Sequence, residues 1–67
     1  MRPPQEHIDT CLEIEKGVPD NLLPLYMSCM NDKPMSQRET DQELHDGCIL
    51  THHVYLKTKP TIQELLG

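Results

Sequence analysis

Histidine and cysteine are the residue types in this 67-residue chain that could carry chemistry, and the chain has four of the first and three of the second. His7 and Cys11 are four residues apart, a spacing that places both side chains on the same side of a helix. A second group falls within nine residues and consists of His45, Cys48, His52 and His53. Imidazole nitrogen and thiolate sulfur are ligands of zinc, and they also form cysteine–histidine nucleophiles.

A zinc site is one interpretation of these residues. Structural zinc takes four donors in a tetrahedron, and metal binding adds folding free energy to a chain with a small core. The donor set that would join three separate segments consists of His7, Cys11, Cys29 and either Cys48 or His52. The chain lacks the closely spaced CxxC pairs that are typical of structural zinc sites. We therefore expect no cofactor and interpret the cysteines as small buried hydrophobic residues, with zinc as the alternative.

A cysteine nucleophile is a second interpretation of the same residues. Cys48 has histidines on both sides in the sequence, and Asp46 could orient one of them. Catalysis requires such groups to be held rigidly around a concave pocket, and 67 residues are too few to enclose a substrate of any size. The size of the chain therefore predicts a protein that is not an enzyme.

The composition argues against several classes of partner. The formal charge is −5 at pH 7, and the six basic residues form no cluster of the kind that binds phosphate groups. No apolar run approaches the length of a membrane span or of a signal-peptide core. Three widely spaced cysteines suit a reducing compartment. We expect an intracellular protein without nucleic-acid or membrane partners.

Two helices are predicted in the first half of the chain. Residues 5–16 follow two prolines and end at Gly17, a residue type favoured just after a helix. Residues 21–31 contain apolar side chains at i, i+3, i+4, i+7 and i+8, which is the strongest helical pattern in the chain. These side chains are Leu22, Leu25, Tyr26, Cys29 and Met30. The short turn between the two segments predicts an antiparallel helical hairpin.

A third, polar helix is expected to end near Asp46. Ser36–Glu39 and Thr40–Glu43 both have the spacing of a capping box, so the helix is expected to start at one of the two, and the sequence does not fix which. Gly47 favours a stop after Asp46. Leu44 is the single large apolar residue of the segment, so we expect this helix to be solvated or held by a partner.

Residues 48–56 are compatible with two structures. Their β-branched and aromatic content favours a short strand, which would need a second copy or the sheet edge of a partner to pair with. One face of that strand would carry Cys48, Leu50, His52, Val54 and Leu56. In the helical alternative, one face would carry Ile49, His52, His53 and Leu56.

The last segment, residues 57–67, is predicted to be a linker and a C-terminal helical turn. Pro60 is expected to end the preceding strand or helix, and Thr61–Glu64 has the spacing of a third capping box. Ile62, Leu65 and Leu66 have the spacing of a helix that docks into a groove of a partner. The expected organisation is one helical domain of residues 1–56 followed by a docking segment of residues 57–67.

These features predict a mainly α, non-catalytic accessory or regulatory protein. A chain this short and this poor in apolar residues gains order by association, so the expected partner is another protein or a second copy in a homodimer. The residues expected to make the contacts are Leu22, Leu25, Tyr26 and Met30 for the hairpin core or interface, Val54, Tyr55 and Leu56 for pairing, and Ile62, Leu65 and Leu66 for docking. The alternative function is a zinc-stapled structural or binding module that uses His7, Cys11, Cys29 and Cys48.

Overall fold

Three α-helices and two short 3₁₀-helices make up residues 2–66, together with the turns between them. The computed structural model describes the backbone of residues 2–66 and the side chains of residues 2–64. In chain order, the helices are α1 (Gln5–Lys16), η1 (Asp20–Leu22), α2 (Leu23–Cys29), η2 (Met35–Gln37) and α3 (Asp41–Leu66). Residues 2–66 form no strand. The mainly α fold class predicted from the sequence is confirmed.

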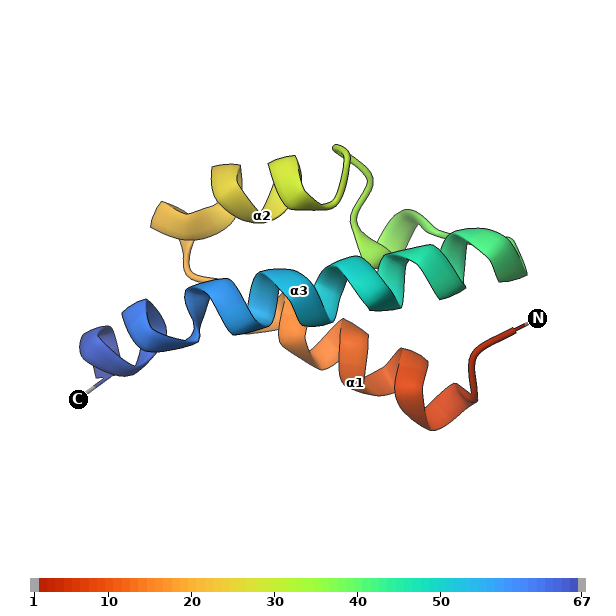
Figure 1. Cartoon of the computed structure of the whole chain (residues 1–67), viewed down its shortest axis with the longest axis horizontal. Helices are drawn as coiled ribbons and strands as arrows, with labels where there is room; N and C mark the ends of the chain where they lie inside the picture. Colours follow the sequence, from red (N-terminus) through yellow and green to blue (C-terminus); the bar gives the residue numbers. More distant parts are fainter. Residues whose placement is uncertain (1, 67) are drawn as a thin grey trace.

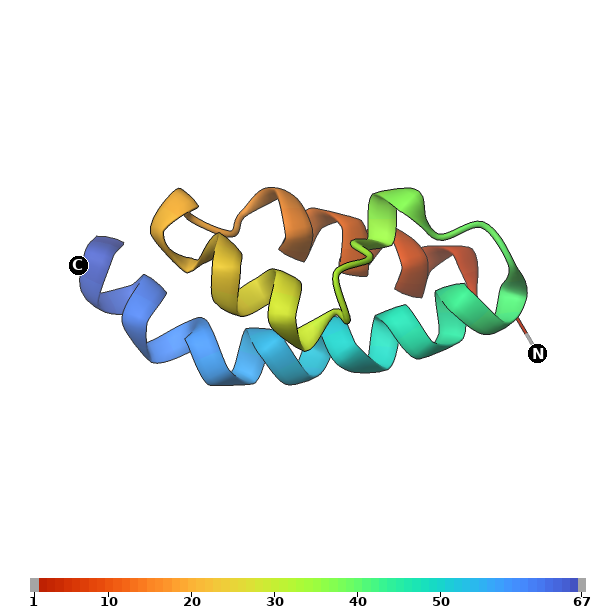
Figure 2. The same cartoon turned by 90° about the horizontal axis from the view of Figure 1, so that it is seen from above.

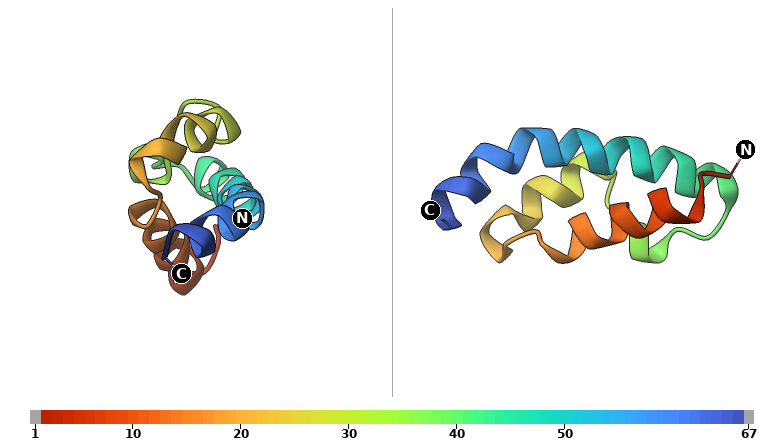
Figure 3. Two further views of the ribbon diagram at one scale, coloured as in Figure 1. Left: turned by 90° about the vertical axis from the view of Figure 1, so that its left-hand side faces the viewer. Right: turned by 90° about the horizontal axis from the view of Figure 1, so that it is seen from below.

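The long helix α3 extends along the whole molecule, and α1 and α2 both pack against it (Figure 1). α1 and α3 run in the same direction, and α2 runs in the opposite direction, as the view from above shows (Figure 2). The view along the long axis shows that the helices surround a common interior (Figure 3). The molecule measures 37 × 22 × 15 Å. Within residues 2–66, no helix is both long enough and apolar enough to cross a membrane.

The core lies between the three helices. Its buried hydrophobic side chains are Ile8, Cys11, Tyr26, Met30, Met35, Leu44, Cys48 and Val54. In the helix predicted for residues 21–31, Tyr26 and Met30 are buried, whereas the side chain of Leu25 is 42% exposed. Adjacent residues project about 100° apart around a helix, so Leu25 cannot share the inward position that Tyr26 occupies.

The strand predicted for residues 48–56 is wrong, and so is the helix stop at Gly47, because α3 continues from Asp41 to Leu66. In a strand, Val54 and Leu56 would lie on one face, but Val54 is 1% exposed and Leu56 is 70% exposed. The helical alternative is correct, and the face it assigned is not the buried one, since Ile49 and Leu56 are both exposed. The face that is buried carries Leu44, Gly47, Cys48, Thr51, Val54 and Thr58.

The buried face of α3 consists largely of small or hydroxyl-bearing residues, and each hydroxyl has a partner. Thr58 donates to the carbonyl oxygen of Val54 at 2.9 Å. Thr51 donates to the sulfur of Met30 at 3.5 Å. Because these hydroxyls are satisfied, the threonines can be buried without the cost of an unpaired polar group. This arrangement makes the helix stable although its apolar pattern is weak.

Gly47 is needed inside α3 for close packing and does not end the helix. A Cβ atom at this position would collide with the Cδ of Arg38 and the Sδ of Met35. The connector after α2 can therefore lie directly on the first turns of α3.

The start of α3 is at the second of the predicted capping boxes, because the backbone N–H of Glu43 donates to Thr40 Oγ1 at 3.1 Å.

Residues 57–66 are not a linker, since they form the last part of α3 and the helix continues through Pro60. Pro60 is exposed, so the carbonyl group that loses its helical donor there can be hydrated. Ile62 is half-buried. The side chains of Leu65 and Leu66, which were predicted to dock, lie outside the described residues.

Tyr26 connects the core to a polar group on α1. Its hydroxyl donates to Glu15 Oε1 at 3.2 Å, and the other carboxylate oxygen of Glu15 accepts the backbone N–H of Ser36 at 3.2 Å. Burial, and then the charge of Glu15, raise the pKa of Tyr26 to about 12. The protonated phenol is thus the form that fits the folded protein.

Alkaline pH should destabilise the protein through Tyr26. The pKa of Tyr26 is higher in the folded protein than the unfolded value of 10.0. The stability that this shift contributes is therefore complete below about pH 10 and is lost as the pH rises through 12. We expect Tyr26 to account for roughly 1 kcal/mol of lost stability at pH 11. The measurement is urea unfolding at pH 8 and pH 11 for the wild type and Tyr26→Phe. Cys11 also titrates in this range but is present in both proteins, so an equal loss in both would contradict the prediction.

Candidate metal centre

The side chains that meet between α1 and α3 come from two pairs with the same spacing. His7 and Cys11 lie one turn apart on α1, which begins at Gln5 directly after Pro4. Cys48 and His52 lie one turn apart on α3. Since both helices are continuous at these positions, each pair projects from one side of its helix.

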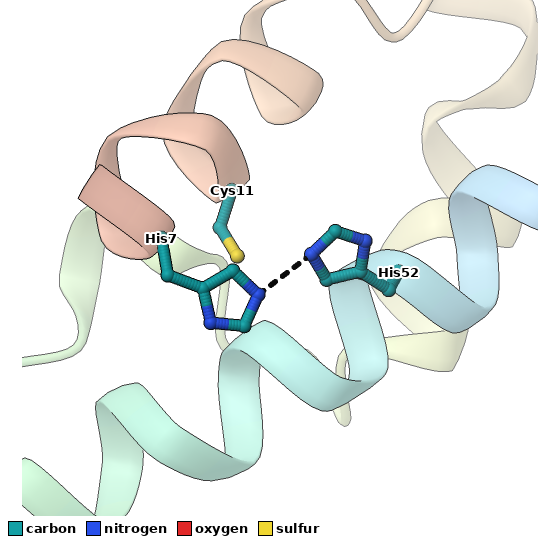
Figure 4. A group of neighbouring side chains, drawn as sticks. All are labelled: His7, Cys11 and His52. Atoms are coloured by element: carbon teal, nitrogen blue, oxygen red, sulfur yellow. Dashed lines mark hydrogen bonds between the residues drawn. The ribbon is translucent and has the colours of Figure 1, made fainter. Parts of the chain in front are cut away.

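His7, Cys11 and His52 form a cluster whose ligand atoms all lie within 4.8 Å of one another. Their side chains point toward a common space between the two helices (Figure 4). The Nε2 atoms of His7 and His52 are 2.8 Å apart, and the rings are stacked with centroids 4.9 Å apart and planes at 29°. One imidazole must therefore donate its proton to the other, so the pair cannot form this bond when both rings are doubly protonated.

The cluster has a buried sulfur and two more accessible nitrogens. Cys11 is 0% exposed, whereas His52 is half-buried and His7 is exposed. Burial, followed by a hydrogen bond to Cys48 and the charge on that thiol, raises the pKa of Cys11 to about 12. Cys11 is therefore a neutral thiol near pH 7, and a metal ion that binds it must displace the proton.

The separations in the cluster are close to those of a tetrahedral site. Two imidazole nitrogens bound to one zinc ion at about 2.1 Å lie roughly 3.4 Å apart. The two Nε2 atoms would have to separate by roughly 0.6 Å from their present 2.8 Å to accept the ion. Rotation of two accessible imidazole rings can supply a change of this size without moving either helix.

The structure brings together some of the predicted zinc ligands and separates others. His7 and Cys11 are in the cluster, whereas Cys48 is outside it, although its thiol is one of the causes of the raised pKa of Cys11. His52, which the sequence analysis named as an alternative to Cys48, is also in the cluster. Cys29 is not part of it, because this residue is at the end of α2 and packs half-buried against the core. The repeated spacing of a histidine and a cysteine at i and i+4 was the available signal for pairing His52 with Cys48.

The residues predicted to bind a partner fall into three groups. Tyr26, Met30 and Val54 are core residues, with exposed fractions of 1%, 0% and 1%. A second group is half-buried and consists of Leu22, Tyr55 and Ile62. Leu25 and Leu56 are exposed and remain available for contacts. Tyr26 and Met30 therefore belong to the core, one of the two places expected for them, whereas the pairing contact expected of Val54 is wrong because the chain buries this side chain itself.

The fold and the cluster define a small three-helix protein with a histidine–cysteine cluster between its first and last helices. Comparisons with protein-family models, with curated proteins and with solved structures find no match to this chain. A function for this protein must therefore be inferred from the geometry of the chain's own residues.

Proposed function

We propose that this protein is a small helical module that binds zinc and that the metal joins α1 to α3. The observation that supports this function is the convergence of His7 Nε2, Cys11 Sγ and His52 Nε2 within 4.8 Å. Zinc accepts this combination of nitrogen and sulfur ligands, whereas magnesium and calcium prefer oxygen. In a chain with a small core, coordinate bonds between two helices would supply a large share of the folding free energy.

The proposal predicts that one zinc ion binds per chain and that His52 is needed for it. We expect His52→Ala to lower the zinc affinity at least about 100-fold, because an imidazole that would bind the ion directly is lost and the site is left with fewer donors. The measurement is isothermal titration of the reduced, metal-free protein with zinc, followed by native mass spectrometry to count bound ions.

The matched control for this experiment is His53→Ala. His53 is the next residue on α3 but is exposed and lies outside the cluster, so its loss should leave the affinity unchanged. A thermal unfolding scan should show that zinc raises the midpoint of the wild type and of His53→Ala, and not of His52→Ala. Zinc binding that is equally strong in the two variants, or absent from the wild type, would contradict the proposed function.

Protein binding is the second candidate function, and the exposed apolar side chains of α3 favour it. Ile49 is 57% exposed and Leu56 is 70% exposed, and their separation of seven residues places them on one face of the helix. An exposed apolar face of this kind is typical of a contact surface, and a second copy of the chain is the partner that can be tested directly.

This second function predicts self-association that depends on Leu56. We expect the wild type to show an apparent mass that rises with concentration, and Leu56→Glu to remain monomeric, because a carboxylate would be desolvated in the contact. The measurement is sedimentation equilibrium at several concentrations. Gln63→Glu adds the same charge at another exposed position of α3 and serves as the control. A wild type that is monomeric throughout would contradict a homodimer.

A further inference from the structure

The zinc site proposed above has three ligands in the cluster, and a tetrahedral ion requires a fourth. Structural zinc sites fill all four positions with side chains, whereas catalytic sites leave one position to water or substrate. The identity of the fourth donor therefore decides whether the site is closed or open. The following inference rests on the proposed zinc-binding function.

We infer that Cys48 is the fourth ligand and that the site is a closed centre of two thiolates and two imidazoles. Cys48 precedes His52 by one turn of α3, which matches the spacing of His7 and Cys11 on α1. It is near enough to Cys11 to be one of the causes of the raised pKa of that thiol. Together with His7, it also lines a small cavity of about 190 Å³ beside the cluster. Cys48 thus lies beside Cys11 and His7 and one helical turn from His52.

The small rearrangement that this site requires is within reach of a cysteine side chain. The Cys48 sulfur is not among the ligand atoms that lie within 4.8 Å of one another. A cysteine has a single side-chain torsion, and a change in this torsion moves the sulfur while the backbone stays in place. Two thiolates at about 2.3 Å from one zinc ion lie roughly 3.8 Å apart, a separation that neighbouring thiols in contact can reach.

Charge balance favours a second thiolate. Zinc bound by Cys11 and two neutral imidazoles would carry a net charge of +1 next to a buried apolar core. A second thiolate from Cys48, which is 1% exposed, cancels that charge and removes the cost of leaving it partly desolvated. Two thiolates also favour zinc and other tetrahedral, sulfur-binding ions over magnesium and calcium.

The other nearby donors fit less well. His45 lines the same cavity, but it is exposed and its Nδ1 lies 3.7 Å from a carboxylate oxygen of Asp46. Cys29 lies at the end of α2 and is not in the cluster. These two residues therefore supply matched controls, one for a thiol and one for an imidazole.

Titration with cobalt(II), followed by its displacement with zinc, tests the inference. Thiolates bound to cobalt(II) give charge-transfer absorption whose intensity grows with the number of sulfur ligands. We expect Cys48→Ser to bind cobalt with about half of the wild-type charge-transfer intensity, since one of two thiolates remains. Cys29→Ser and His45→Gln should retain the full intensity. Full intensity in Cys48→Ser would overturn the inference, and the zinc-binding function would still stand.

A measurement on the unaltered protein removes any dependence on the folding of variants. X-ray absorption at the zinc edge counts the sulfur donors per metal ion in the wild type, and we expect two sulfur and two nitrogen donors. One sulfur with an oxygen donor would overturn the inference and indicate an open site. An absence of bound zinc or cobalt in the wild type would instead contradict the proposed function itself.

Discussion

Tyr26→Ala is expected to unfold the protein at 25 °C. Tyr26 is the largest of the fully buried side chains, and the chain contains neither Trp nor Phe that could fill the space. Removing a buried aromatic side chain costs roughly 3–5 kcal/mol, and a core of this size supplies a total stability of the same order. Far-ultraviolet circular dichroism should therefore show a large loss of helical signal without denaturant.

Tyr26→Phe is the control that separates the ring from its hydroxyl. This variant keeps the buried ring and loses the hydrogen bond to Glu15, whose carboxylate still accepts from Ser36. We expect a loss of about 1 kcal/mol and a cooperative urea transition that remains intact. If Tyr26→Ala unfolded with a midpoint close to that of the wild type, the core would not be centred on this residue.

Arg38→Ala should have the second-largest effect on stability. The guanidinium Nε donates to the carbonyl of Lys33 at 2.9 Å, and Nη2 donates to the carbonyl of Met30 at 2.9 Å. Nη1 donates to the carbonyl of Glu43 at 3.0 Å, on the first turn of α3. One side chain thus holds the end of α2, the connector and α3 together. We expect a loss of roughly 2–4 kcal/mol in urea unfolding, because three carbonyl groups lose a charged donor.

Arg38→Lys tests whether geometry or charge is responsible. A lysine ammonium is a single point donor and cannot reach three carbonyl groups that the planar guanidinium contacts at once. We therefore expect this variant to recover less than half of the stability lost in Arg38→Ala. Full recovery in Arg38→Lys would show that a positive charge alone is sufficient. An Arg38→Ala variant as stable as the wild type would contradict the prediction, because the connector would then not need the hydrogen bonds of Arg38.

The first helix could be predicted from the sequence because all of its signals are local. Pro4 and Gly17 bracket residues 5–16, and α1 spans the same residues. The capping box at Thr40 is equally local, and it marks the start of α3. Each of these features depends on hydrogen bonds and backbone preferences within one turn of the chain.

The course of α3 could not be predicted in the same way. Gly47, Cys48 and Thr51 look like a weak helical face, and they are favourable there because the surrounding helices approach closely and satisfy their polar atoms. Pro60 is tolerated inside the helix although its local preference is to end one. Packing between distant segments therefore overrides local preference along this helix.

The candidate site was predictable in part. The pair of His7 and Cys11 follows from spacing on a predicted helix, and it lies in the cluster. The sequence left Cys48 and His52 as alternatives, because the strand and the helix considered for residues 48–56 both place these two residues on one side of the element. Cys29, by contrast, lies outside the cluster and packs half-buried against the core, a placement that depends on how α2 packs and not on spacing along the chain.

The distance along the chain between His7 and His52 has a consequence for the order of folding. These residues are 45 positions apart, and the helix that carries His52 follows α1 and α2 in the chain. A contact with so large a sequence separation forms late, after the intervening chain has ordered enough to offset the entropy of closing the loop. During synthesis, therefore, the two imidazoles can meet only after the part of α3 that carries His52 has emerged, so the proposed metal would be captured after α1 and α2 have been made.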